Sequence, residues 1–172
     1  MIVMEEESRA RARGARIFAD VMGVGFGASL AHSMRDCLSQ ADTSAGAVDY
    51  LILDARGSWA DDAQEYAAIE SVFGRDSTVR MSAPKSVYGN LIAASMGTDL
   101  ATACLALERQ AVPPTVGDFA TLRIPPTGHH VVGACESATL SSVLVNGRDN
   151  YGHGMSILLG APRQVAERGE GS

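Results

Sequence analysis

Apolar residues along this chain recur with two different spacings, and stretches of the two kinds alternate. A period of two, or a short unbroken apolar run, is typical of a β-strand, whereas apolar residues three to four positions apart indicate a helix. The strand-like stretches are "RIFADVMGVGFG" (16–27), "VDYLILDA" (48–55), "STVRMSA" (77–83), "SATLSSVLVN" (137–146) and "GMSILLG" (154–160). The helical stretches are 29–46, "DDAQEYAAIESVFG" (61–74) and 89–109. The alternation predicts an α/β protein with a mixed central sheet, helices on both faces and a closing hairpin.

Glycines and capping residues set the expected ends of two helices. Gly14 is placed to close a short helix in "EEESRARARGA". The helix that precedes Gly74 has Asp61 or Asp62 as its expected cap, because short acidic side chains accept the free backbone N–H groups at a helix start. Gly74 is expected to end that helix.

The longest predicted helix runs from near Gly89 to Arg109, and Pro113 and Pro114 stop it. Small residues are frequent in this helix, which favours tight packing on all of its sides. Its inner side is expected to carry Leu91, Ile92, Ser95, Gly97, Leu100, Cys104 and Leu107.

The remaining segments have weaker patterns. "MIVM" (1–4) has strand character, the glycines of "GVGFG" (23–27) are expected to end a strand in a bulge, and residues 116–133 have a loop-like composition. We therefore expect one domain over residues 1–163 and a polar tail over 164–172.

Composition and charge exclude several classes of protein. The chain has 172 residues, 46% of them hydrophobic, which suits a single compact core. Its net charge of -6 disfavours nucleic acid as a partner. No stretch has the ~18 apolar residues of a membrane span, and the start lacks the features of a signal peptide. The three widely spaced cysteines fit a reducing compartment, so we expect a cytoplasmic protein without a membrane partner.

The histidines and glycines suggest neither a metal site nor a cofactor. His129 and His130 have no cysteine or carboxylate at ligand spacing, and His153 lies in the turn of the closing hairpin. No GxSxG motif occurs, and no lysine follows "GVGFG" at the spacing of a phosphate-binding loop. We expect no cofactor and no metal.

Four segments, in this order, resemble the carboxyl-terminal half of a β-ketoacyl synthase. They are "EEESRARARGARIFADVMGVG", "VDYLILDARGSWADDAQEYAAIESVFG", "SAPKSVYGNLIAASMGTDLATACLALERQAVPPT" and "VLVNGRDNYGHG". These condensing enzymes have the thiolase fold of two pseudo-repeated βαβαβαββ halves, and they extend acyl chains on an acyl carrier protein by decarboxylative condensation. The resemblance implies one such half here, with "MIVM" inside the last strand of the other half and the nucleophilic cysteine supplied by another polypeptide.

The resemblance places two catalytic histidines in this half. The first opens an HGTGT-type motif before a D-x-x-E helix. "DARGSWADDAQE" (54–65) keeps Asp62 and Glu65 but has Asp54 at the histidine position. A histidine there donates a hydrogen bond to the thioester oxygen, whereas an ionised aspartate cannot donate and would repel the forming enolate. We expect this replacement to abolish ordinary catalysis.

The second histidine ends a K-S-x-x-G-H motif in the family. "KSVYGN" keeps Lys85, Ser86 and Gly89 but has Asn90 at the histidine position. An asparagine amide can still donate a hydrogen bond to an oxyanion, but it cannot change its protonation state. Lys85 could equally be a turn lysine that pairs with a carboxylate, and a buried Asp54 within its reach would form a structural ion pair.

The family also has a glycine-rich acyl gate of the type NSFGFGG near its last hairpin. "NGRDNYGHG" keeps Asn146 and Gly152 and replaces the remainder of the gate by Arg148, Asp149, Asn150 and Tyr151. Adjacent charged residues argue against an apolar tunnel at this point.

The resemblance therefore implies a catalytically deficient, ketosynthase-like subunit. Loss of both histidines is similar to chain-length factors, the inactive partners of type II polyketide ketosynthases. We expect a ketosynthase, or its amino-terminal half, as the partner in a hetero-oligomer, with an acyl carrier protein as a further candidate. One alternative is the active half of a split ketosynthase, in which Asn90 and Lys85 hold the oxyanion. Another is a stand-alone binding module.

Overall fold

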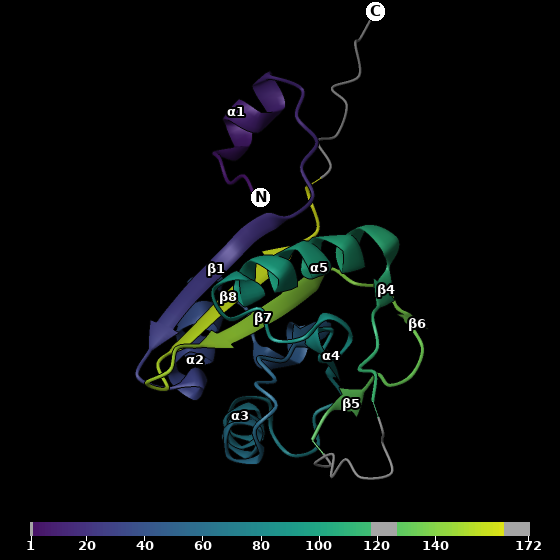
Figure 1. Cartoon of the computed structure of the whole chain (residues 1–172). Helices are drawn as coiled ribbons and strands as arrows, with labels where there is room; N and C mark the ends of the chain where they lie inside the picture. Colours follow the sequence, from purple (N-terminus) through teal and green to yellow (C-terminus); the bar gives the residue numbers. More distant parts are fainter. Residues whose placement is uncertain (1, 118–126, 164–172) are drawn as a thin grey trace, which may run out of the picture.

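The structure, a computed structural model, describes residues 2–117 and 127–163. Within them the chain forms a six-stranded mixed sheet in the order β1-β8-β7-β2-β3-β5, with a separate ladder of β4 and β6 (Figure 1). The strands are β1 (Asp20–Gly27), β2 (Tyr50–Ile52), β3 (Arg80–Ser82), β4 (Ala111–Val112), β5 (His129–His130), β6 (Glu136–Ser137), β7 (Ser142–Arg148) and β8 (Gly154–Gly160). The predicted tail over 164–172 and part of the predicted loop over 116–133 lie outside the described residues.

The strand directions place several strand ends along one edge of the sheet. Strands β7, β2, β3 and β5 are parallel to one another, and β8 pairs antiparallel with both β7 and β1. Strand β1 therefore runs in the same direction as β7. The carboxyl ends of β1, β7, β2 and β3 consequently lie on one side, which we call the carboxyl edge. In α/β sheets this is the edge at which functional side chains gather.

Helices cover both faces of the sheet (Figure 1). α2 (Leu30–Gln40) and α3 (Trp59–Phe73) pack on one face, and α5 (Ser95–Arg109) packs on the other. The short helices are α1 (Glu7–Ala12), η1 (Ala45–Ala47), α4 (Lys85–Tyr88) and η2 (Ile92–Ala94). Successive strand residues enter different cores: Leu51 packs in the core under α2 and α3, whereas Tyr50 packs in the core under α5. The main elements follow the order β1-α2-β2-α3-β3-α5-β7-β8, which confirms the predicted βαβαβαββ half of a thiolase-like fold.

Glycines inside β1 allow α2 to lie directly on the sheet. A Cβ atom on Gly25 would clash with the carbonyl oxygen of Ser33 and the amide nitrogen of Cys37. The sequence predicted that these glycines end the strand in a bulge. β1 does end at Gly27, but the predicted bulge at its end was wrong, because the irregularity of the strand lies earlier, between Val21 and Gly23. The glycines serve close packing between helix and strand.

The start of α3 differs from the prediction, whereas its end agrees with it. Ser58, and neither Asp61 nor Asp62, is the cap, because its hydroxyl oxygen accepts the N–H of Asp61 at 3.2 Å. Gly74 follows the last residue of the helix with a φ of +83°. Gly14 likewise closes α1, with a φ of +69°.

The helix predicted from Gly89 to Arg109 is broken in its first part. Gly89 has a φ of +84° and Ile92 a φ of +54°, so α5 begins only at Ser95. A left-handed backbone at a β-branched residue is incompatible with a continuous helix, and apolar spacing does not reveal it. The buried side of α5 consists of Ser95, Asp99, Ala103, Ala106 and Leu107, whereas Leu91, Ile92 and Gly97 of the predicted inner side are exposed.

The structure also differs from the prediction in two segments with weak sequence patterns, residues 2–4 and the loop that contains His129 and His130. Residues 2–4 are exposed and lie outside any strand, in contrast to the strand character of their sequence. His129 and His130 form β5 within the predicted loop and pair in parallel with β3. A strand of two residues is too short to show a periodic pattern. No helix in the described part of the chain is long and apolar enough to cross a membrane.

Candidate functional site

Three charged side chains meet at the carboxyl edge because they follow neighbouring strands. Arg148 is the last residue of β7, Asp54 lies two residues beyond β2, and Lys85 begins α4 after β3. Arg148 Nε donates to Asp54 Oδ2 at 2.9 Å. Lys85 Nζ donates to the main-chain oxygen of Asp54 at 2.5 Å and lies 3.6 Å from Asp54 Oδ1. Asp54 is therefore held between two cations.

Two further carboxylates complete this group from the helices on the two faces. Both oxygens of Glu65 in α3 accept backbone N–H groups, from Asp54 at 2.7 Å and from Ala55 at 2.8 Å. Asp99 Oδ2 in α5 lies 3.0 Å from Lys85 Nζ. We call Asp54, Glu65, Lys85, Asp99 and Arg148 the charge cluster. Each of these side chains is at most 9% exposed.

Burial sets the electrostatics of the charge cluster. Burial, reinforced by the negative charge of Asp54, raises the pKa of Glu65 to about 7. Burial also raises the pKa of Asp99, although the neighbouring Lys85 opposes that shift. Three carboxyl groups thus share two buried cations, and the partly exposed Arg56 contributes a third positive charge 3.9 Å from Asp54.

The cluster lacks the parts of a condensing site among the described residues. Asp54 has only acceptor oxygens when ionised, and the Lys85 ammonium and the Arg148 Nε and Nη1 atoms face protein oxygens. The three cysteines of the chain lie elsewhere: Cys37 is on the buried side of α2, where burial raises its thiol pKa to about 11. The arrangement suits a compensated ion network and supplies no nucleophile.

Asn90 lies apart from the charge cluster. Its side chain is exposed, and its Oδ1 accepts the N–H of Ile92 at 3.0 Å and the hydroxyl of Ser95 at 2.8 Å. Because both neighbours donate, the amide oxygen is committed to the turn that follows Gly89. Within the described residues Asn90 forms no hydrogen bond with Asp54 or Lys85. The structure therefore does not bring the three predicted positions Asp54, Lys85 and Asn90 into one bonded group.

The supporting residues predicted from the sequence lie around the cluster. Asp62 Oδ1 accepts the N–H of Gly57 at 3.3 Å, and burial raises the pKa of Asp62. Asn150 Oδ1 accepts from Arg56 Nη2 at 2.8 Å in the turn between β7 and β8. Gly152 lies in the same turn with a φ of +89°.

Sequence reasoning missed Asp99 and the bonding of Arg148 to Asp54. A signal for Asp99 was present, because it is the single charged residue on the buried side of α5, four positions after Ser95. No local signal marked Arg148 as a partner of Asp54, since 94 residues separate them and only the pairing of β7 with β2 brings them together.

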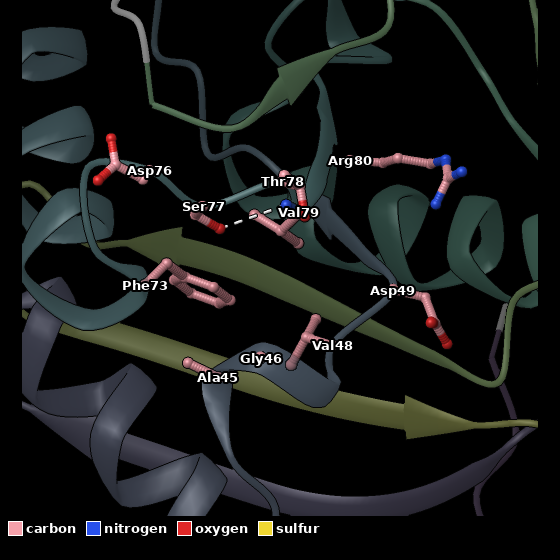
Figure 2. A pocket seen from close by; sticks show the side chains of 10 residues that line it. All are labelled: Ala45, Gly46, Val48, Asp49, Phe73, Asp76, Ser77, Thr78, Val79 and Arg80. Atoms are coloured by element: carbon pink, nitrogen blue, oxygen red, sulfur yellow. Dashed lines mark hydrogen bonds between the residues drawn. The ribbon is translucent and has the colours of Figure 1, made fainter.

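A hollow in the described residues lies at the opposite end of β2 and β3. It has a volume of about 320 Å³, and Figure 2 shows Phe73 and Asp76 on one side of it and Asp49 and Arg80 on the other. Arg80 donates to Glu136 at 2.8 Å, so its charge is already neutralised. The hollow is far from the charge cluster in the fold, because it is formed at the amino-terminal ends of the strands whose carboxyl ends carry Asp54 and Lys85. We therefore take the cluster as the candidate site.

Comparisons with known proteins identify the family of the chain. The family model described as "Beta-ketoacyl synthase, C-terminal domain" matches residues 18–118. Nodulation protein E of Rhizobium meliloti is 35% identical over 127 residues, which cover 67% of this chain and 32% of that protein. A putative polyketide beta-ketoacyl synthase 2 of Streptomyces halstedii is 33% identical over 171 residues, covering 92% of this chain and 41% of that protein.

Solved structures agree as well. The ishigamide ketosynthase/chain length factor superposes with a TM-score of 0.81 at 28% identity, over 91% of this chain and 41% of that chain. The chain thus spans about a third to two fifths of the length of these relatives. Its sequence and its βαβαβαββ fold show that the chain belongs to the β-ketoacyl synthase family, in which it matches the carboxyl-terminal domain.

Proposed function

We propose that this chain is a catalytically deficient, ketosynthase-like subunit that completes or shapes a ketosynthase/chain-length-factor assembly in polyketide or fatty-acid-type biosynthesis. The observation that carries the proposal is that Asp54, at the first histidine position, is buried and paired with two cations. Its carboxylate is bonded by Arg148 and faces Lys85. A buried acceptor in this position has no proton to give to a thioester oxygen.

The second histidine position supports the same function. Asn90 uses its amide oxygen to hold the backbone before α5, and its side chain has no ionisable proton. Decarboxylative condensation requires hydrogen-bond donors aimed at one oxyanion. In this chain the two positions serve local structure.

Apolar side chains on the α5 face supply a surface for the partner. Val24 and Phe26 of β1 point away from α2, since the alternate residues Gly23 and Gly25 face that helix, and Phe26 is 61% exposed. Leu105 of α5 is also exposed, and α5 packs mainly over β7. Exposed apolar surface of this kind marks a protein interface. In the proposed assembly a cysteine-bearing amino-terminal ketosynthase half, or a complete ketosynthase, covers it.

Reconstitution with a cysteine-bearing ketosynthase partner tests the proposal. The two proteins are co-expressed, and malonyl decarboxylation, acyl transfer and product length are measured with and without this chain. We expect Phe26→Asp to prevent co-purification of the pair, because it places a charge in the interface. We expect Asn90→Ala to leave decarboxylation within twofold of the unaltered pair. The exposed Ala12→Asp is the matched control and should leave the complex intact.

Two outcomes would contradict the proposal. A loss of decarboxylation specific to Asn90→Ala would show that the chain is the active half of a split ketosynthase. A stable, monodisperse monomer that binds no ketosynthase would instead identify a stand-alone module.

A further inference from the structure

Two arginines cross between the β2–α3 loop (residues 53–58) and the turn that joins β7 to β8. Arg148 extends from the end of β7 toward the loop and the start of α3. Its Nε donates to Asp54 Oδ2 at 2.9 Å, and its Nη1 donates to the carbonyl oxygen of Asp61 at 3.0 Å. Arg56 reaches in the opposite direction, with Nη1 donating to the carbonyl oxygen of Asp149 at 3.0 Å and Nη2 to Asn150 Oδ1 at 2.8 Å. Three of these hydrogen bonds join the loop to the end of β7 and its turn, and the fourth joins Arg148 to the first turn of α3.

The turn itself is a small, internally bonded unit. Asp149 Oδ1 accepts the N–H groups of Tyr151 at 2.8 Å and His153 at 2.9 Å, and Asp149 Oδ2 lies 2.8 Å from His153 Nδ1. The backbone N–H of Asp149 in turn donates to the carbonyl oxygen of His153 at 3.0 Å. We call residues 149–153 the hairpin tip. Because the tip is bonded within itself, contacts to Asp149 and Asn150 hold it as a whole.

We infer that Arg56 and Arg148 form a latch that keeps the hairpin tip closed on the β2–α3 loop and seals the charge cluster from water. Charge-assisted bonds from arginine are among the stronger hydrogen bonds in proteins, and the planar guanidinium loses little freedom when it donates to two acceptors.

Burial makes one half of the latch strong and leaves the other half accessible to experiment. The side chains of Arg148 and Asp54 are 5% and 9% exposed, so any opening that displaces the end of β7 together with the tip would separate two desolvated charges. Arg56 is 22% exposed and binds neutral oxygens of the tip. Removing Arg56 therefore weakens the latch and takes one positive charge from near Asp54, which keeps Arg148 and Lys85 as partners.

Amide hydrogen exchange on the full chain tests the latch. We expect Arg56→Met to raise the exchange rates of the Tyr151 and His153 amides at least tenfold, while amides in α2 keep their rates. Arg148→Met should also raise the rates at Asp54 and Ala55, whose N–H groups are bonded to Glu65. Should Arg148→Met fail to fold, Asn150→Ala removes one acceptor of the latch and must show the tip effect.

Arg75→Met is the matched control. Arg75 is an exposed arginine that binds Glu70 at the end of α3, so its removal should leave exchange at the tip unchanged. Wild-type exchange rates at Tyr151 and His153 in both Arg56→Met and Asn150→Ala would overturn the latch. Equal increases at the tip and throughout α2 would also overturn it, because they would indicate general destabilisation.

Discussion

The ammonium group of Lys85 lies 3.0 Å from Asp99 Oδ2, and both side chains are buried, at 4% and 0% exposed. Tyr88 strengthens this arrangement, because its hydroxyl donates to Asp99 Oδ1 at 3.0 Å. Lys85 also donates a hydrogen bond to the main-chain oxygen of Asp54, which lies two residues beyond the end of β2. One lysine thus connects the loops after β2 and β3 to α5 on the far side of the sheet. An exposed turn lysine would have no such connections.

Replacing Lys85 with methionine should reduce the free energy of unfolding by about 3–5 kcal/mol, because Asp99 and Asp54 would lose a buried counter-charge. The double variant Lys85→Met/Asp99→Asn should recover part of that loss, since it removes one of the stranded charges. Urea denaturation of the two single variants and the double variant measures the coupling. Strictly additive losses would show that the 3.0 Å pair contributes no net interaction energy.

The raised pKa of Glu65 predicts how the free energy of unfolding depends on pH. This pKa is raised from 4.5 to about 7 in the folded protein, mainly by burial. Between these values the folded state keeps a proton that the unfolded state releases, so stability is greatest below pH 4.5 with respect to this group and falls as pH rises to 7. The loss is on the order of 3 kcal/mol, at about 1.4 kcal/mol for each pKa unit. Asp99, whose pKa is also raised, adds to the same trend.

Urea midpoints measured from pH 5 to pH 8 check this dependence. Glu65→Gln should be less stable at pH 5, because an amide cannot accept from both backbone N–H groups, but its midpoint should vary less with pH. Glu136→Gln is a matched surface control, because Arg80 and His129 lower the pKa of Glu136 and its side chain is a third exposed. An unchanged pH slope in Glu65→Gln would assign the titration to another group.

Sequence patterns predicted the main elements because their signals are local. The apolar run around Leu51 and the stop at Gly74 depend on residues close in sequence, and both agree with the structure. The break before α5 was not predictable in this way. It depends on Ile92 in a left-handed conformation, which is held in place because Asn90 Oδ1 accepts the N–H of Ile92 and Ser95 Oγ accepts the N–H of Leu91. The spacing of apolar residues does not predict hydrogen bonds between side chain and backbone of this kind.

The candidate site was predictable in its positions and not in its bonding. The resemblance located Asp54 and Lys85, and the parallel order of β2 and β3 explains why they lie together. The bond from Arg148 depends on β7 entering the sheet beside β2, and the Asp99 pair depends on α5 crossing the opposite face. Long-range pairing of this kind decides which charges are compensated. A single sequence does not display it.

Replacing Gly57, in the β2–α3 loop, should change stability only through the backbone conformation. Gly57 has a φ of +79°, and a Cβ atom added there would meet no atom within 4 Å. Gly57→Ala should therefore lower the free energy of unfolding by about 0.5–1 kcal/mol: the left-handed backbone costs an alanine about 1–2 kcal/mol, and the reduced freedom of the unfolded chain offsets part of that cost. Thermal or urea unfolding measures the change.

Gly46 is the matched comparison for this effect, because a Cβ atom there would also meet no atom within 4 Å, yet its φ is not positive. Gly46→Ala should raise the free energy of unfolding by about 0.4–1 kcal/mol, since only the entropy of the unfolded chain changes. The two substitutions add the same methyl group to open space and should act in opposite directions. Equal effects would mean that backbone strain at Gly57 is not what constrains the loop that carries Asp54 and Arg56.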